Sequence, residues 1–303
     1  MDKEKKQEFK NLFYRKVLTE LSFFERKRLR VLFGAILLGF IGVLAGVLII
    51  IFMPKTGARH EMDLPFFIIV LSISVAFYII KRFKDSVKSK IYPIIFKIFS
   101  LNYSRITSSF VNLMDFLDNT SILGGYSSVD TDDVFSGIHN DLPFELVETT
   151  ITNGHGKNRR TIFNGIVFVA KSNKTFNKIT VIKNDAGMLN ALNGGNFERI
   201  KLEDVEFEKA FEVYGQDQVE SRYLLTTSFM DRLLNYTKMR RCNLKVTFYD
   251  GKIIFFIPKL WNSFEVPILD SLFKIEYYMK VIEEVYDLLE IIDALMLEQN
   301  IGL

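Results

Sequence analysis

Residues 31–53 read VLFGAILLGFIGVLAGVLIIIFM, and residues 64–80 read LPFFIIVLSISVAFYII. The first run holds no charged side chain, and a helix of that length rises about 35 Å, enough to cross a hydrocarbon core of about 30 Å. The second run spans about 25 Å, near the lower limit, with Ser72 and Ser74 as its clearly polar members. Because only residues 54–63 separate the runs, we expect a tight antiparallel transmembrane hairpin over 31–80. A buried core helix of a soluble protein is the alternative for each run.

Positive charge flanks both outer ends of this hairpin. The flanking basic residues are Arg26, Lys27, Arg28 and Arg30 before the first run, and Lys81, Arg82, Lys84, Lys88 and Lys90 after the second. The connecting segment carries only Lys55 and Arg59. The positive-inside bias therefore predicts that both termini are cytoplasmic, with the flanking cations near lipid headgroups. Since thirty mostly polar residues precede the first run, we do not expect a cleaved signal peptide.

A stripe of small residues marks the first run. Ala35, Gly39, Gly42 and Gly46 recur at spacings of four, three and four, so another helix could approach closely there. One interpretation is packing against the second helix, opposite Ser72, Ser74 and Ala76. The other is a homodimer formed through Gly42-x-x-x-Gly46.

Two further segments adjoin the hairpin. Residues 1–30 show the pattern of an amphipathic helix, with apolar side chains near one face and Lys, Arg and Glu opposite. This helix could lie in the membrane interface or pack on the soluble domain. Residues 81–100 form a basic juxtamembrane segment, in which we expect Pro93 to kink or restart any helix.

The charge is divided unevenly along the chain. Residues 1–100 contain 18 Lys and Arg against 8 Asp and Glu, whereas the remaining 203 residues contain 21 against 28. An acidic soluble part is a poor candidate for nucleic-acid binding, which requires clustered cations. The single cysteine, Cys242, excludes an intramolecular disulfide and a cysteine-based metal cluster.

Residues 101–303 show the pattern of a cytoplasmic α+β domain. Strands are predicted over 144–150, 161–171, 178–182, 243–249 and 252–257, and Asp250-Gly251 is typical of a tight hairpin turn. Residues 119–133 are rich in Ser, Asp and Gly and are predicted to form a loop. Helices are predicted over 226–238 and 271–297. The fold class is therefore α+β, with antiparallel strands, an internal helix and a long C-terminal helix.

The last helix has an apolar stripe that is wide rather than narrow. Val281, Leu288, Ile291 and Leu295 broaden a 3–4 repeat, which favours packing across a sheet over a coiled coil. Its other face is acidic. We expect that face to be solvated, or to meet the basic membrane-proximal segment.

The sequence contains no recognisable catalytic or metal-binding set. His60, His139 and His155 stand apart from other metal-ligand residues. Gly154-His-Gly-Lys157 lacks the Ser or Thr and the helix of a phosphate loop and is interpreted as a hairpin turn. We therefore expect no cofactor and no metal, although carboxylates assembled in space could still act in proton transfer.

The densest polar group of the chain follows a predicted strand that ends at Gly215. It consists of Asp217, Glu220, Arg222, Thr226 and Arg232, with Thr226 placed to cap a helix. The acids and Arg222 could pair and hold this corner, which makes it a candidate interaction or structural site.

The same stretch, Phe211 to Leu233, resembles the signature F-E-V-Y-G-x-D-x-V-E-x-R-Y-L-L-T-x-x-F-M-x-R-L of an uncharacterised bacterial membrane protein family, a domain of unknown function. Members have a two-helix membrane hairpin and a cytoplasmic domain. Thr227 stands where the family usually shows Pro, and Phe163 to Phe168 is also similar. The resemblance implies an inner-membrane location and, as a partner, a LemA-like membrane protein; it implies no activity.

Three functions remain open at this point. The first is a membrane-anchored adaptor or regulatory module that binds a protein partner at the cytoplasmic face. The second is a membrane-associated enzyme or lipid-handling domain that uses Asp217, Glu220 or Arg222. The third is self-assembly into a homo-oligomer through the glycine stripe.

Overall fold

The computed structural model describes residues 3–52, 63–105, 110–184, 197–259 and 264–295. The chain divides into two compact units. Unit 1 comprises residues 1–99 and 265–281, and unit 2 comprises residues 100–264 and 282–303. The predicted connection of the hairpin lies outside the described residues, except for Asp63.

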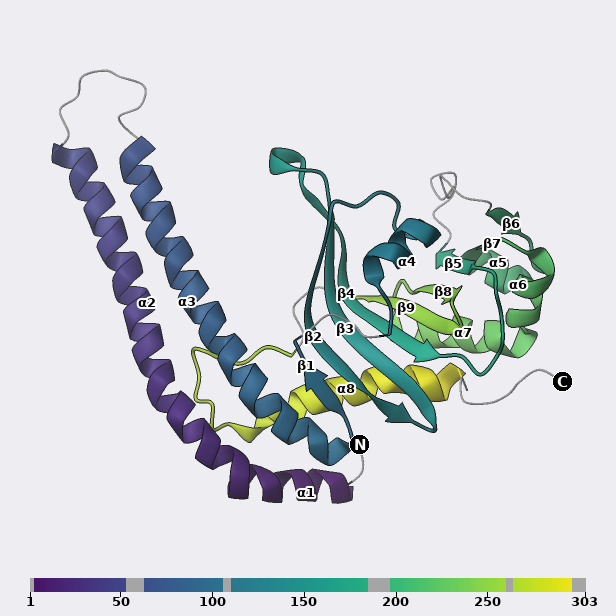
Figure 1. Ribbon diagram of the computed structural model, residues 1–303, viewed down its shortest axis with the longest axis horizontal. Helices are drawn as coiled ribbons and strands as arrows, with labels where there is room; N and C mark the ends of the chain where they lie inside the picture. The colour runs from purple at the N-terminus through teal and green to yellow at the C-terminus, as the bar shows by residue number, and fades with distance from the viewer. Residues whose placement is uncertain (1–2, 53–62, 106–109, 185–196, 260–263, 296–303) are drawn as a thin grey trace. The chain divides into compact units, whose positions relative to one another are not determined.

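Unit 1 is helical. Helix α1 (Lys3–Leu12) continues through a π-helical turn, η1 (Phe13–Val17), into α2 (Leu18–Phe52), and α3 (Asp63–Phe96) is followed by a 3-10 turn, η2 (Lys97–Phe99). Helices α2 and α3 run side by side (Figure 1). Both are long and apolar enough to cross a membrane, by length and composition. Helix α3 continues past Pro93 and ends three residues later.

The apolar face of the N-terminal helix is covered by protein. Phe9, Phe13 and Val17 are fully buried. The ring centroid of Phe9 lies 6.2 Å from that of Phe99, and Phe13 lies 5.5 Å from Tyr278. The sequence left open whether this face meets the membrane interface or the soluble domain. In the structure it packs on other residues of unit 1, namely Phe99 and Tyr278.

Unit 2 contains a nine-stranded antiparallel sheet in its described residues, with the order β1-β2-β3-β4-β9-β8-β5-β7-β6. The strands are β1 (Asn102–Ser104), β2 (Ser128–His139), β3 (Leu142–Asn153), β4 (Arg160–Lys171), β5 (Thr180–Asn184), β6 (Glu198–Ile200), β7 (Phe211–Gly215), β8 (Lys245–Tyr249) and β9 (Lys252–Pro258). The helices are α4 (Leu113–Thr120), α5 (Val205–Ala210), α6 (Gln218–Leu224), α7 (Thr227–Arg240) and α8 (Ile275–Leu295), which enters unit 2 at Ile282. The predicted α+β class is confirmed.

Two tight turns set the register of neighbouring strands. Asp250 and Gly251 both have positive φ and join β8 to β9, as the sequence predicted. Asn140 and Asp141 also have positive φ and join β2 to β3. Two consecutive left-handed residues match the right-handed twist of the strands they connect, so each hairpin closes after two residues.

The core of unit 2 has helices on both sides of the sheet. Helix α4 covers one face, where the rings of Phe116 and Phe256 stack at 5.8 Å. The apolar stripe of α8 is buried, including Ile282, Val285 and Ile292, and the helix runs along the sheet (Figure 1). This confirms the packing role predicted from the width of the stripe.

Acidic side chains of α8 contact basic side chains inside unit 2. Glu284 pairs with Lys259, Glu290 pairs with Arg240, and Asp293 lies 2.8 Å from Nε2 of His139. The side chains of Glu284, Glu290 and Asp293 remain 26%, 51% and 48% exposed. The face is therefore partly solvated, as expected, and it also has basic partners within unit 2.

Candidate functional site

The polar corner begins where β7 ends. A Cβ atom on Gly215 would lie 2.6 Å from Cδ1 of Ile200 and would overlap the side chain of Ser221, so only glycine fits between β6 and α6. The Ser221 hydroxyl lies 2.7 Å from that of Thr180 and donates to the Asp217 carbonyl, also at 2.7 Å. The strand, the turn and the helix are thus locked together by small side chains.

Two residues of the corner are helix N-caps, Thr226 as predicted and Asp217 in addition. The Asp217 carboxylate accepts from the Glu220 amide at 2.8 Å at the start of α6. The Thr226 hydroxyl accepts from the Phe229 amide at 3.3 Å at the start of α7, which confirms the predicted cap. Each cap satisfies a backbone N–H that has no partner inside its helix.

Glu220 holds a distant loop. Its carboxylate accepts from the Asn177 amide at 3.1 Å and from the Lys178 amide at 2.6 Å, just before β5 begins. This carboxylate therefore acts on the backbone of a segment more than forty residues away.

The two arginines of the corner behave differently from the acids. Arg222 is exposed, and within the described residues its guanidinium forms no ion pair with Asp217 or Glu220. Arg232 is half-buried, and its Nη1 has no hydrogen-bond partner in the described part of the chain. The corner is held together by bonds to backbone amides, and among the described residues its acids do not form the ion pair with Arg222 that the sequence left open.

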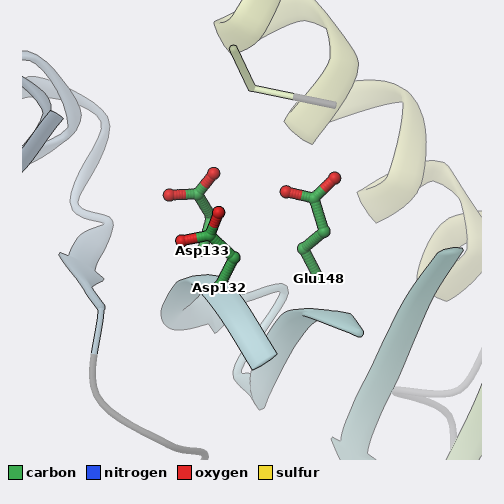
Figure 2. Close-up of side chains that lie close together, drawn as sticks. All are labelled: Asp132, Asp133 and Glu148. Atoms are coloured by element: carbon green, nitrogen blue, oxygen red, sulfur yellow. The ribbon is translucent and has the colours of Figure 1, made fainter. Parts of the chain in front are cut away.

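A second polar cluster, the carboxylate cluster of Asp132, Asp133 and Glu148, lies on β2 and β3. The register between these strands shifts between Thr131 and Val134, so two residues of β2 lie opposite one residue of β3. Such a β-bulge re-aims side chains. Figure 2 shows that all three side chains rise on the same side of the strands, and one carboxylate oxygen from each lies within 4.8 Å of the other two.

Two neighbouring residues bind to this carboxylate cluster. Arg105 donates to Asp132 at 2.6 Å, and the Tyr103 hydroxyl donates to Asp133 at 2.5 Å. Grouped carboxylate oxygens are ligands that Ca²⁺ and Mg²⁺ prefer, but here an arginine already supplies positive charge beside them. Sequence analysis missed this cluster because residues 119–133 were predicted to form a loop, whereas β2 begins at Ser128. The signal that could have indicated the cluster was the consecutive pair Asp132 and Asp133, with Glu148 in the strand that follows.

Three residues of the small-residue stripe are buried and one, Gly39, is not. A Cβ on Gly42 would overlap Ser72 of α3, and one on Gly46 would lie 2.6 Å from Ile69. Ala35 is also buried, whereas Gly39 has open space around it. Gly42-x-x-x-Gly46 is therefore covered by α3 of the same chain.

Two of the flanking basic residues, Arg28 and Lys88, are buried, whereas most of the others are exposed. Arg28 is 6% exposed; it binds the Glu25 carboxylate at 2.8 Å and the Ile268 carbonyl at 2.9 Å. Lys88 is 1% exposed and lies 3.4 Å from Glu265, which also accepts from Lys84 at 2.8 Å. These cations, expected at lipid headgroups, thus hold residues 265–272 of unit 1.

The same contacts set the protonation of two acids in unit 1. Burial alone would raise the pKa of Glu25, but hydrogen bonds from Arg28 and from the Leu272 amide bring it below its usual value. For Glu265, burial is likewise outweighed by the charges and hydrogen bonds of Lys88 and Lys84, so its pKa is lowered. Both carboxylates are therefore ionised at neutral pH.

Comparison with known proteins finds a family similarity over part of the chain. No protein with a curated description matches this sequence. The crystal structure of the mycobacterial trehalose monomycolate transport factor A, TtfA, is similar at 8% identity and a TM-score of 0.33, over 64% of this chain and 90% of that one. Residues 161–297, from β4 to the C-terminal helix, match a family described as "Protein of unknown function (DUF3137)". Over those residues the chain thus carries a domain of unknown function similar to that family.

Proposed function

We propose that this chain is a multi-pass protein of the bacterial inner membrane whose soluble domain is an adaptor or regulatory module for a protein partner. The hairpin of residues 31–53 and 64–80 forms the anchor, and both termini are cytoplasmic. The observation that carries this proposal is the apolar surface of α2 and α3.

That surface is large and continuous along both helices. Side chains such as Phe33, Phe40, Phe66 and Phe77 are mostly exposed, although the two helices pack against each other. Contiguous apolar surface of this extent is a liability in water, whereas a bilayer covers it at no cost. The helical backbone satisfies its own hydrogen bonds, as a lipid environment requires.

The orientation rests on the basic flanks. Arg26, Lys27 and Arg30 precede the first span, while Lys81 and Arg82 follow the second. Cations adjoining a span are retained on the cytoplasmic side.

A binding role is favoured over catalysis by the way the corner is used. The carboxylates of Asp217 and Glu220 accept hydrogen bonds from backbone amides, and Thr226 caps a helix. Groups held in this way organise a surface rather than transfer protons. A protein partner, with a LemA-like membrane protein as the candidate that the family resemblance implies, would meet such a surface. The alternative is a membrane-associated enzyme or lipid-handling domain.

The anchor and its orientation can be tested in cells. In a Cys242→Ser background, single cysteines are introduced by Thr56→Cys in the connection and Val219→Cys in the soluble domain. We expect a membrane-impermeant maleimide to label position 56 in intact spheroplasts and position 219 only after lysis. Labelling of position 219 in intact spheroplasts would refute the orientation, and release of the protein by alkaline carbonate would refute the anchor.

The adaptor role is tested by in-cell photocrosslinking from exposed positions of unit 2, followed by mass spectrometry. A specific partner that is lost when Arg222→Glu is introduced would support the proposal. Purified full-length protein that instead turns over a lipid or nucleotide substrate would favour the alternative.

A further inference from the structure

Residues 265–273 form the interfacial segment, which lies within unit 1 between the soluble sheet and α8 in the sequence. Four contacts join it to the two long helices: Glu265 with Lys84 and Lys88, the Ile268 carbonyl with Arg28, and the Leu272 amide with the Glu25 carboxylate at 2.9 Å. The segment is therefore held at a defined height along α2 and α3.

That height is close to the proposed membrane surface. With a rise of about 1.5 Å per residue, Arg28 lies about 4.5 Å before the first apolar run and Lys84 about 6 Å after the second. The headgroup layer on each side of a bilayer is about 5–7 Å thick. The Ile268 carbonyl, bound to Arg28, is consequently at headgroup depth.

The segment presents apolar side chains at this depth. Leu269 is 82% exposed and Phe273 is 41% exposed, and Phe23 of α2 is exposed as well. Glu265 and the backbone groups of Ile268 and Leu272 are turned to α2 and α3 through the four contacts above. Asp270 is engaged by Lys274 and Tyr277 at the start of α8, and the apolar side chains of Leu269 and Phe273 stay exposed. Arg26 and Lys27 stand at the same level of α2 and attract anionic headgroups.

We propose that the interfacial segment is a third membrane contact, in which Leu269 and Phe273 enter the headgroup–acyl boundary of the bilayer beside the hairpin. The occupant of these apolar side chains is lipid because the segment is bound to α2 and α3 within a few residues of their apolar runs, beside the exposed cations Arg26 and Lys27. The proposal rests on the proposed anchoring by the hairpin. It gives the start of α8 a fixed position at the membrane, in addition to the covalent link through the hairpin.

The test uses the full chain with Cys242→Ser, reconstituted in vesicles of phosphatidylcholine and phosphatidylglycerol. An environment-sensitive fluorophore is attached to Leu269→Cys, to Phe40→Cys in the middle of α2 and to Val219→Cys in the soluble domain. Phe40 and Val219 are 64% and 79% exposed, so all three positions accept a label. Lipids with a nitroxide near the headgroup or deep in the acyl chain serve as quenchers.

We expect position 269 to be blue-shifted and quenched most by the shallow nitroxide, position 40 most by the deep nitroxide, and position 219 by neither. If the label at position 40 is quenched but the label at position 269 is not, as at position 219, this inference is overturned and the anchor stays intact. A label at 269 that is shielded from aqueous iodide but not quenched by lipid would also overturn it, because protein would then cover the site. Absence of quenching at 40 would refute the anchor itself.

Discussion

Replacing Glu220 by alanine tests whether the polar corner is structural. The Glu220 carboxylate accepts hydrogen bonds from the two backbone amides of Asn177 and Lys178. A hydrogen bond to a charged group contributes about 1.5–3 kcal/mol, and the low end applies at this partly exposed site. Loss of two such bonds lowers the free energy of unfolding by about 3 kcal/mol. In a soluble domain of this size that corresponds to about 6–12 °C in melting temperature.

The measurement is thermal unfolding of the full-length protein in detergent, followed by circular dichroism. Glu220→Gln keeps one acceptor oxygen, so we expect it to lose about half as much. Glu203→Ala is the matched control, since Glu203 is an exposed acid in the same unit. If Glu220→Ala melts together with the control, the carboxylate does not hold the loop, and Glu220 becomes available again for a chemical role.

Three further results are expected. Gly42→Leu overlaps Ser72 and should destabilise the hairpin by about 1–3 kcal/mol in detergent unfolding, whereas Gly39→Leu, with open space, should not; equal effects would contradict the packing of α2 on α3. Burial and the neighbouring Lys245 lower the pKa of Lys183 to about 8, so NMR of the dimethylated protein should show a lysine signal, lost in Lys183→Arg, that titrates near pH 8. Because this folded-state pKa lies below the unfolded one, its effect on stability should improve as pH rises from about 8 to 10.5. Arg105→Ala removes a cation from the carboxylate cluster, and we expect a lower melting temperature that millimolar Mg²⁺ partly restores; a Mg²⁺ response equal to that of the wild type would argue against cation preference there.

Elements with a strong local signal were predicted from the sequence. The wide stripe of α8, the cap at Thr226 and the Asp250-Gly251 turn depend on residues within a few positions of one another, and each was found. Strand β2 was not predicted, because Asp130 to Asp133 resemble a loop, and the short strands β1 and β6 are too brief to show alternation. Such strands form because a neighbouring strand offers them hydrogen bonds.

The sites depended more on tertiary structure than the elements did. Glu220 was recognised as part of a polar corner, but its partners are the amides of residues 177 and 178, which no local pattern indicates. The carboxylate cluster exists because a bulge sets two residues of β2 against one of β3. A register shift of this kind results from pairing between strands and has no signature within either strand.

The hairpin sequence alone, through its length and lack of charge, determined that α2 and α3 are long and apolar enough to cross a bilayer, since these properties belong to the helix itself. Its basic flanks looked uniform in sequence. Only the tertiary structure decided that Arg28 and Lys88 are buried against residues 265–272, while other basic residues of the flanks, such as Arg26 and Lys90, remain exposed to solvent. The physical reason is that a cation is buried only where a carboxylate or a carbonyl meets it. Besides the local carboxylate of Glu25, the partners here are Ile268 and Glu265, more than 170 residues away in the chain.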